Sequence, residues 1–377
     1  MPAATIVDVL REHAERRPAA TSFLFLSNGQ VEQERVGFHE LERRAAAVAA
    51  ELQQRRLAGE RVVLMFQPGL EFICAFFGCL AARVIAVPVY PPRRAQECKH
   101  VLQIARAAGA RRVLTDTATA ELLARLGETS SGLPPLEAVT WLAEPTEVEV
   151  RAQAARREQL DPDGIAFLQF TSGSTGAPKG VIVTHANIVA NQRAICDGFG
   201  HGEDTTVLGW LPFYHDMGLV GVVMQPVFLG RPCVLMPPAA FIQKPVRWLE
   251  AISRYRATTS GGPNFAYQLC VDAIAEADLE RCAGLDLSGW RLAFVGSEPV
   301  RAVTLDRFAE KFKAVGFDRR AFYPCYGLAE ATLMLTGPER PRACASVRLD
   351  ADALAEGRTV QAGSDREIGR ASCRERV

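Results

Sequence analysis

A segment rich in glycine and hydroxyl side chains, with a single cation, lies near the middle of the sequence. It reads Thr171-Ser172-Gly173-Ser174-Thr175-Gly176-Ala177-Pro178-Lys179-Gly180. Glycines allow tight turns and a close approach of the backbone to a ligand. Successive backbone N–H groups form a concave anion site, while the hydroxyl groups and Lys179 add donors and positive charge. The segment therefore predicts a loop that binds the phosphates of a nucleotide.

This segment differs from the P-loop of nucleotide triphosphatases. That motif ends in Gly-Lys-Ser/Thr, whereas here Pro178 precedes Lys179 and Gly180 follows it. A flexible polar connection between two strands is the alternative interpretation of any Gly/Ser-rich segment. The order of residue types over the whole segment, between two apolar runs, favours the phosphate loop.

Short apolar runs alternate with amphipathic segments along most of the sequence, and this alternation is typical of βαβ units with parallel sheets. We therefore predict an α/β fold with βαβ subdomains of mainly parallel sheet. The pattern predicts strands over 61–66, 84–90, 112–115, 165–171, 206–211 and 291–295. It predicts helices over 38–57, 69–82, 95–108, 186–199, 241–255 and 300–312.

Two further short motifs follow predicted strands or turns. Gly296-Ser297-Glu298-Pro299 comes directly after the strand at 291–295, at the end of a strand where α/β sheets bind ligands. The second motif is Tyr326-Gly327-Leu328-Ala329-Glu330. The second motif has a plain structural alternative, because Tyr326 can belong to the core and the Glu330 carboxylate can stabilise the first turn of a helix.

Together with the segment at 171–180, these motifs resemble those of the adenylate-forming superfamily. That superfamily includes acyl-CoA synthetases, fatty acyl-AMP ligases and nonribosomal-peptide adenylation domains. The resemblance extends over nearly all of the chain up to about Gly363. It implies the large N-terminal domain of the adenylate-forming fold, with ATP and Mg²⁺ as cofactors.

The resemblance also assigns roles to individual residues. It implies phosphate contacts from Thr171, Ser172, Gly173, Ser174, Thr175, Gly176 and Lys179. It implies contacts on the adenine side from Gly296, Ser297, Glu298, Pro299, Tyr326 and Gly327, with the tyrosine ring stacked on the base. Glu330 and Thr175 would hold Mg²⁺, and Lys179, His215 and Glu330 would be the catalytic residues.

His215 stands beside Asp216, after the predicted strand at 206–211. A single histidine is more often structural than catalytic, and adjacent side chains usually diverge, so the pair alone does not predict a dyad. The resemblance implies a place for His215 near the reacting carboxylate and the α-phosphate. We expect His185, in contrast, to lie at the start of a helix without contact to a ligand.

Four stretches are most similar to the fatty acyl-AMP ligase branch. They are Trp210-Leu211-Pro212-Phe213-Tyr214-His215-Asp216-Met217-Gly218-Leu219, Pro263-Asn264-Phe265-Ala266-Tyr267, Leu328-Ala329-Glu330-Ala331-Thr332 and Pro88-Val89-Tyr90-Pro91-Pro92. The resemblance implies ATP-dependent conversion of a fatty acid to an acyl-adenylate with release of pyrophosphate. Candidate residues for an apolar acyl slot are Val220, Val222, Met224, Phe265 and Leu269.

The branch implies an acceptor for the acyl group, the phosphopantetheine thiol of an acyl carrier protein, often within polyketide or nonribosomal synthase modules. One alternative is a fatty acyl-CoA synthetase, with coenzyme A as the acceptor. An alternative of another class is a non-catalytic nucleotide- or acyl-binding remnant. The residues leave both alternatives open.

Composition limits the remaining classes. The chain has 377 residues, 48% of them hydrophobic, with 43 basic and 43 acidic side chains and a formal net charge of zero. The hydrophobic fraction excludes a mainly disordered chain, and the zero net charge argues against nucleic-acid binding. No apolar run is long enough for an integral membrane segment. Scattered cysteines without a C-x-x-C pair indicate reduced thiols and a cytoplasmic location.

Two parts of the sequence, an internal polar connection and the C-terminal tail, lack the regular apolar pattern. Polar stretches at 127–135 and 143–163 predict a surface connection, with a subdomain break near 143–163. We expect one domain over 1–365 and a non-native tail over 366–377, which is arginine-rich and matches an in-frame translation of a common sequencing adapter. The superfamily's C-terminal lid domain, with its catalytic lysine, and its ribose-binding aspartate are expected to be absent before Val377. We therefore expect impaired adenylation by this chain.

Overall fold

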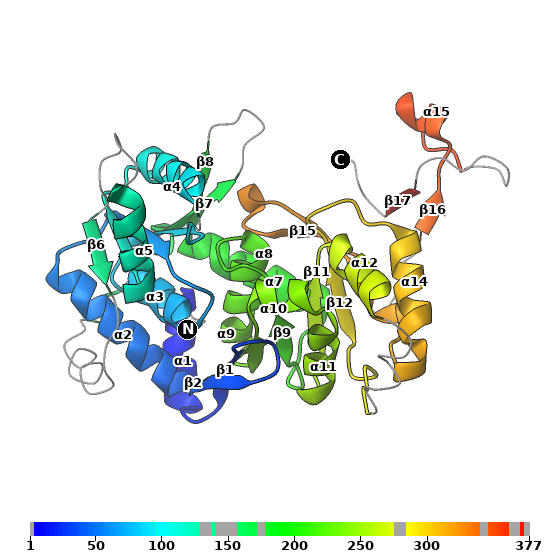
Figure 1. Ribbon diagram of the computed structural model, residues 1–377, viewed down its shortest axis with the longest axis horizontal. Coiled ribbons are helices and arrows are strands. Elements are labelled where there is room, and N and C mark those ends of the chain that lie inside the picture. Colours follow the sequence, from blue (N-terminus) through cyan, green and yellow to red (C-terminus); the bar gives the residue numbers. More distant parts are fainter. Residues whose placement is uncertain are drawn as a thin grey trace.

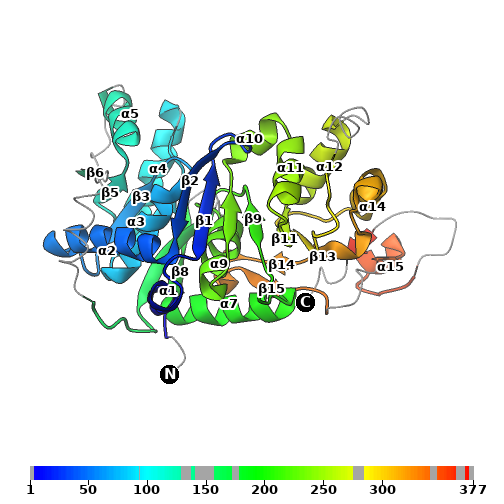
Figure 2. The ribbon, with the colours of Figure 1, turned by 90° about the horizontal axis from the view of Figure 1, so that it is seen from below.

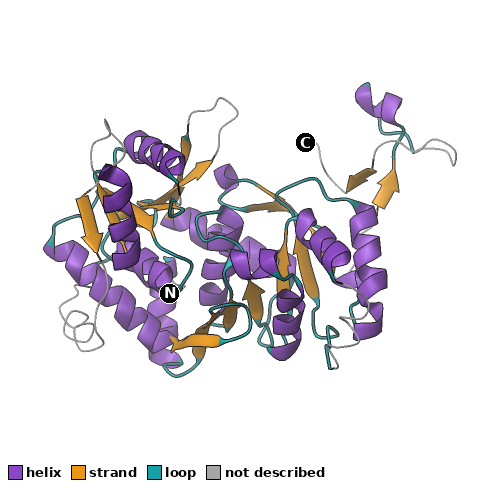
Figure 3. Cartoon of the chain, viewed as in Figure 1, coloured by secondary structure: helices purple, strands orange, loops and turns teal. Residues whose placement is uncertain are grey.

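A computed structural model describes residues 4–92, 94–128, 137–140, 157–171, 178–274, 284–339, 346–361 and 370–372. Figures 1 and 3 show two sheets with helices packed on their faces. Residues 172–176 of the predicted phosphate loop lie outside the described residues, as do most of the predicted connection at 143–163 and most of the tail at 366–377. The predicted α/β fold with mainly parallel sheets is confirmed.

The first sheet has six strands among the described residues, and all of its pairs are parallel except the last. In spatial order they are β6 (Glu137–Thr140), β5 (Arg112–Thr115), β3 (Arg61–Met65), β4 (Ile85–Val89), β7 (Ile165–Thr171) and β8 (Lys179–Thr184). Val62 and Leu64 of β3 join one apolar cluster, and Val63 and Met65 join another. Both faces of this sheet are therefore covered, as parallel sheets require.

The second described sheet has seven strands, and its N-terminal hairpin supplies the only antiparallel pair among them. In spatial order they are β13 (Phe322–Pro324), β12 (Leu292–Val295), β11 (Thr259–Gly262), β9 (Val207–Gly209), β10 (Cys233–Leu235), β1 (Thr21–Leu26) and β2 (Glu32–Gly37). Two short described pairs follow: β14 (Tyr326–Gly327) with β15 (Met334–Thr336), and β16 (Ser346–Arg348) with β17 (Arg370–Ser372).

Helices cover both sheets. Those of the described residues are α1 (Ile6–Arg16), α2 (Phe38–Gln54), α3 (Leu70–Ala81), α4 (Ala95–Ala108), α5 (Thr117–Glu128), α7 (His185–Phe199), α8 (Asp216–Gly218), α9 (Gln225–Leu229), α10 (Pro238–Gln243), α11 (Val246–Arg254), α12 (Asn264–Ala273), α14 (Ala302–Phe312) and α15 (Ala351–Ala355). A π-helix, η1 (Leu219–Met224), joins α8 to α9, and the 3₁₀ turns are η2 (Lys313–Val315), η3 (Arg319–Ala321) and η4 (Ala329–Ala331). Every helix in the described ranges is too short or too polar to span a bilayer.

A cluster of aromatic side chains fills the layer between the seven-stranded sheet and the helices α11, α12 and α14. Trp248, Tyr267 and Phe308 are fully buried there and pack edge to face, with the Trp248 and Tyr267 ring centroids 5.5 Å apart and those of Tyr267 and Phe308 5.2 Å apart. Their polar atoms are satisfied, because Trp248 Nε1 donates to Ser260 Oγ at 2.8 Å and the Tyr267 hydroxyl donates to the Phe294 carbonyl at 2.8 Å. This rigid layer supports the ends of β11 and β12.

The expected break near 143–163 does not separate the two sheets. β7 and β8 follow it in sequence, yet β7 pairs with β4 and completes the six-stranded sheet. The N-terminal hairpin β1–β2 instead pairs with β10 in the other sheet. The order of the strands in each sheet therefore differs from their order along the chain. The polar composition of 143–163 carries no information about this strand pairing.

The predicted helix 241–255 is wrong in its extent. The structure has two helices, α10 and α11, with Lys244 and Pro245 between them. Proline has no amide hydrogen to donate within a helix, and its ring clashes with the preceding turn, so the chain begins a new helix there.

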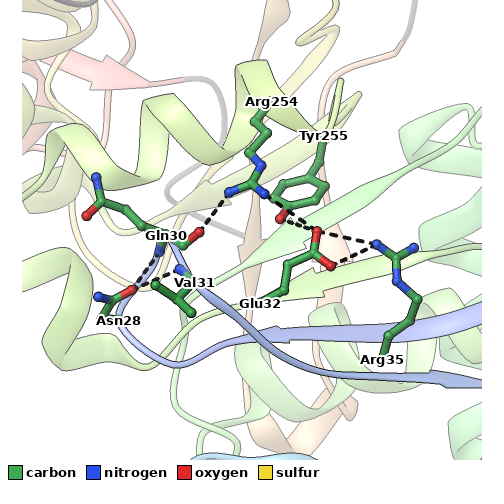
Figure 4. A network of polar contacts seen from close by, with 7 residues as sticks. All are labelled: Asn28, Gln30, Val31, Glu32, Arg35, Arg254 and Tyr255. Atoms are coloured by element: carbon green, nitrogen blue, oxygen red, sulfur yellow. Dashed lines mark hydrogen bonds and ion pairs between the residues drawn. The ribbon is translucent and has the colours of Figure 1, made fainter.

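The structure contains a hairpin, β1–β2, that was not predicted from the sequence, although its Asn28-Gly29 dipeptide is a hairpin signal. Figure 4 shows how its turn is held against α11. Arg254 Nη1 donates to the Gln30 carbonyl at 2.7 Å, and the Tyr255 hydroxyl donates to Glu32 Oε1 at 2.8 Å. Burial and the Glu32 carboxylate raise the pKa of Tyr255 to about 12, so this hydroxyl stays a donor at neutral pH.

Helix α7 touches elements of both halves of the molecule. Thr184 begins it with a capping box shared with Asn187, and Gly200 ends it in a left-handed conformation. It contacts β8 of the six-stranded sheet near its start and β15 near its end. In Figure 2 it runs along the lower edge, from β8 toward β15.

His185, at the start of α7, predicts a pH dependence of stability. The side chain is buried, and burial lowers the pKa of His185 below its usual 6.5. The folded state therefore favours the neutral imidazole, so stability is full above about pH 6.5 and falls as the pH drops through the folded-state pKa. Thermal melts between about pH 7 and 5 should show a smaller loss for His185→Gln than for the wild type. Equal losses would contradict the assignment.

Candidate functional site

A cavity of about 280 Å³ lies where chain segments from both sheets meet. Its wall comes from the end of β7, one side of α7, the segment from His215 to Gly221, the segment after β12 and the hairpin β14–β15 with its connecting turn. The wall residues are Thr171, Ile195, Phe199, His215, Asp216, Met217, Gly221, Phe294, Gly296, Ser297, Cys325, Tyr326, Gly327, Leu328, Ala329, Glu330, Leu333 and Met334.

Seven predicted site residues line this one cavity. They are Thr171, His215, Gly296, Ser297, Tyr326, Gly327 and Glu330. They come from segments up to 159 residues apart, since 330 − 171 = 159. The predicted phosphate-loop residues Ser172, Gly173, Ser174, Thr175 and Gly176 lie outside the described residues, but the loop departs from Thr171 in the cavity wall.

Lys179, Glu298 and Pro299 are not in the cavity wall. Lys179 is exposed at the start of β8, and its Cα pairs with that of Thr171, so it flanks the strand end that reaches the cavity. Glu298 Oε1 accepts the backbone N–H of Phe265 at 2.6 Å. This contact places its carboxylate at the N-terminus of α12, where a negative charge is favourable.

Glu330 lies in the 3₁₀ turn η4, and its side chain is exposed. Within the described part of the chain, its carboxylate makes no hydrogen bond or ion pair. The turn ends at Thr332, whose φ of 71° and ψ of −55° are unfavourable for a β-branched residue. A free carboxylate on a strained turn facing a cavity is a typical arrangement of a ligand-binding residue.

Two glycines allow backbone segments around the cavity to approach each other. A Cβ atom on Gly327 would lie 1.9 Å from the Leu333 carbonyl oxygen, and one on Gly296 would lie 2.7 Å from that of Cys325. Both contacts are with backbone atoms, which cannot move aside cheaply. Next to Gly296, Ser297 has a φ of 65°, which is unusual for a residue other than glycine.

Several side chains give the cavity an apolar character suited to a planar ring. Phe199 and Phe294 stack with centroids 5.9 Å apart, and Tyr326 is 48% exposed. Burial raises the pKa of the Cys325 thiol to about 12, so this thiol remains uncharged at neutral pH. A face of Tyr326 is thus accessible to a flat ligand, next to neutral walls.

His215 and Asp216 converge, although the sequence analysis expected adjacent side chains to diverge. The distance from His215 Nδ1 to Asp216 Oδ1 is 2.7 Å, and the Met217 N–H donates to the same oxygen at 2.6 Å. The hydrogen bond to Asp216 raises the pKa of His215 above its usual 6.5. The turn at the start of α8 brings the two side chains together, and the Asp216 carboxylate favours the protonated imidazole in the cavity wall.

We expect Asp216→Asn to lower the pKa of His215, because the amide carries no charge to stabilise the imidazolium. Titration of the histidine ring signals by NMR should show the imidazolium persisting to higher pH in the wild type than in the variant. The backbone spectrum serves as the control for folding. Identical titration curves in the two proteins would contradict the geometry.

Asn191, which contacts the turn carrying Glu330, was not predicted as a site residue from the sequence. Asparagine is unfavourable in a helix interior, so Asn191 and Gln192 within α7 were a usable signal.

The five candidates for an acyl slot are not in the wall of this cavity. Val220, Val222 and Met224 are fully buried in or beside η1 and belong to the core.

Comparison with known families agrees with the geometry. The family model for AMP-binding enzymes matches residues 10–351, which is most of the chain. The chain belongs to the AMP-binding enzyme family. Every residue of the cavity wall lies within the range that the family model matches.

Curated relatives in the family act on fatty acids. The medium-chain-fatty-acid–[acyl-carrier-protein] ligase TtuA of Teredinibacter turnerae is 38% identical over 96% of this chain. The medium-chain-fatty-acid–[acyl-carrier-protein] ligase JamA of Moorena producens is 39% identical over 94% of it. The chain spans only 61% and 60% of the length of these two relatives.

Solved structures are similar as well. A fatty acid AMP ligase from Legionella pneumophila superposes with a TM-score of 0.88 at 37% identity, over 98% of this chain and 63% of that one. A fatty acyl-adenylate ligase from L. pneumophila, in complex with acyl adenylate and pyrophosphate, superposes with a TM-score of 0.87, over 97% of this chain and 62% of that one. The likeness therefore covers the whole described fold.

Proposed function

We propose that the protein to which this chain belongs activates a fatty acid with ATP, forming an acyl-adenylate and pyrophosphate. The observation that carries the proposal is the convergence of Thr171, Tyr326 and Glu330 on one cavity. Ligases that act on fatty acids, and a similar structure that holds acyl adenylate and pyrophosphate, support the same chemistry. A cytoplasmic location belongs to the proposal, since the described cysteines are all free thiols.

In the proposed reaction, a carboxylate oxygen of the fatty acid attacks the α-phosphorus of ATP. The bond from that phosphorus to the oxygen of the β-phosphate breaks, and pyrophosphate leaves with the electron pair. Both reactants are anions, so the site must reduce their repulsion and hold them in line. We assign the pyrophosphate to the loop that runs from Thr171 to Lys179, and the adenine to the exposed face of Tyr326.

Charged side chains at the cavity would stabilise the transferring group. Lys179 carries a positive charge beside the strand end that begins the loop. His215, whose imidazolium is stabilised by Asp216, would face the acyl carboxylate and the α-phosphate. Donors aimed at developing negative charge act more strongly in such a partly enclosed site than in water.

Glu330 is suited to coordinate a magnesium ion. Its carboxylate is exposed in the cavity wall and has no partner within the described residues, and Mg²⁺ is typically held by one or two carboxylates together with waters and phosphate oxygens. Thr175 is the second proposed ligand. When bound, Mg²⁺ supplies neutralisation of phosphate charge. Glu330 would hold the ion in the cavity wall that Thr171 also lines.

Lys179→Ala and Glu330→Gln should each slow pyrophosphate release from ATP and a fatty acid by about 100-fold or more in the full-length protein. Removal of one well-placed charge-stabilising donor typically costs about 2.7–4 kcal/mol. Lys313→Ala and Glu310→Gln are matched controls, because both side chains are exposed and lie outside the cavity wall. Unchanged rates in the first pair of variants would refute the roles.

We further propose that the acyl group passes to the phosphopantetheine thiol of an acyl carrier protein, as the names of the relatives TtuA and JamA support. The full-length protein, supplied with a fatty acid, ATP and either holo carrier protein or coenzyme A, should yield thioester mainly with the carrier protein. Mass spectrometry of both products decides the question. Faster formation of acyl-CoA would indicate an acyl-CoA synthetase instead.

A further inference from the structure

One buried amide in α7 binds the turn that carries Glu330. Asn191 Nδ2 donates to the Ala331 carbonyl at 3.1 Å and to the Met334 carbonyl at 2.9 Å. Its Oδ1 accepts the Met334 N–H at 3.2 Å. Two carbonyls and one N–H around the amide determine its orientation, and the side chain uses both of its donor hydrogens.

These three hydrogen bonds lie on either side of a strained residue. Thr332, with its φ of 71°, stands between Ala331 and Met334 and is itself buried. The turn also has its own backbone bonds, from Leu328 N–H to the Leu333 carbonyl at 3.0 Å and from Thr332 N–H to the Ala329 carbonyl at 2.8 Å. A strained backbone persists only where its surroundings hold it, and Asn191 supplies the contact from outside the turn.

The same amide reaches the tyrosine side of the site. Met334 pairs with Gly327, and Thr336 pairs with Tyr326, in the hairpin β14–β15. Asn191 binds both polar backbone atoms of Met334, so the position of the hairpin depends on α7. α7 in turn follows directly from β8, which carries Lys179 at its start.

We propose that Asn191 is a positioning residue that holds Glu330 and Tyr326 in register with the β7–β8 hairpin that flanks the predicted phosphate loop. This inference rests on the proposed function, because it concerns the binding of ATP and Mg²⁺ at that site. Glu330 would hold the metal ion, and Asn191 would act on Glu330 through the backbone of the turn. Without the amide, two partly buried carbonyls and one N–H lose their partner, and the strained turn relaxes.

Hydrogen–deuterium exchange on the ligand-free chain tests the contact itself. Peptides covering 326–336 should exchange about tenfold faster in Asn191→Ala than in the wild type, because the turn opens more often. Gln192→Ala is the matched control, since that neighbouring buried amide donates to the Val220 carbonyl at 3.0 Å and does not touch the turn. Equal exchange in wild type and Asn191→Ala would overturn the proposal.

Nucleotide binding tests the consequence. The dissociation constant of ATP, measured by calorimetry on the full-length protein with Mg²⁺ and again with EDTA, gives the gain in affinity due to Mg²⁺. This gain should fall about tenfold in Asn191→Ala, as it does when supports of a metal ligand are removed elsewhere. Glu330→Gln should lose the gain without faster exchange at 326–336. Absence of ATP binding by the full-length wild-type protein would refute the proposed function, and the exchange experiment would still decide on the contact.

An isosteric variant separates positioning from packing. Asn191→Asp keeps the volume of the side chain but turns a carboxylate oxygen toward the Ala331 and Met334 carbonyls. The proposal predicts that this variant exchanges as fast at 326–336, and loses as much of the Mg²⁺-dependent affinity, as Asn191→Ala. Retention of wild-type values by Asn191→Asp, with Asn191→Ala impaired, would indicate a packing role and overturn the proposal.

Discussion

Helix α7 couples two parallel sheets that open onto one cavity, and the rest of the site depends on this coupling. The helix begins at the end of β8, at the edge of the six-stranded sheet, and contacts β15 beside the seven-stranded sheet. Binding of a triphosphate with its metal ion requires protein groups that contact the phosphates and the ion from several directions. Neither sheet alone supplies these sides, because Thr171 belongs to one sheet and Tyr326 follows the last strand of the other.

Backbone strain around the cavity is balanced by the rigid layers behind it. Ser297 and Thr332 both have positive φ values, and Gly327 lies against the Leu333 carbonyl at a distance that admits no side chain. Such conformations persist only in over-determined surroundings. The aromatic layer around Trp248 and Tyr267 and the amide of Asn191 provide those surroundings.

Charge at the site is sparse and directed. Asp216 raises the pKa of His215, Lys179 stands at the strand end, and Glu330 offers a carboxylate that has no partner within the described residues. Between them the wall is neutral, since the Cys325 thiol stays protonated. The proposed site for two anionic reactants would therefore combine a few placed charges with a largely apolar cavity, in which those charges act strongly.

The sequence alone was enough to predict the α/β class, most element positions and the motifs at 171, 296 and 326, because residue periodicity and glycine spacing are local properties. It could not determine that β7 returns to the first sheet, that Pro245 divides a helix, or that His215 and Asp216 converge. Those outcomes depend on strand pairing and on dihedral angles set by distant neighbours. Asn191 is the clearest case: its partners lie 140 and 143 residues away, and only the packing of α7 against the turn brings them together.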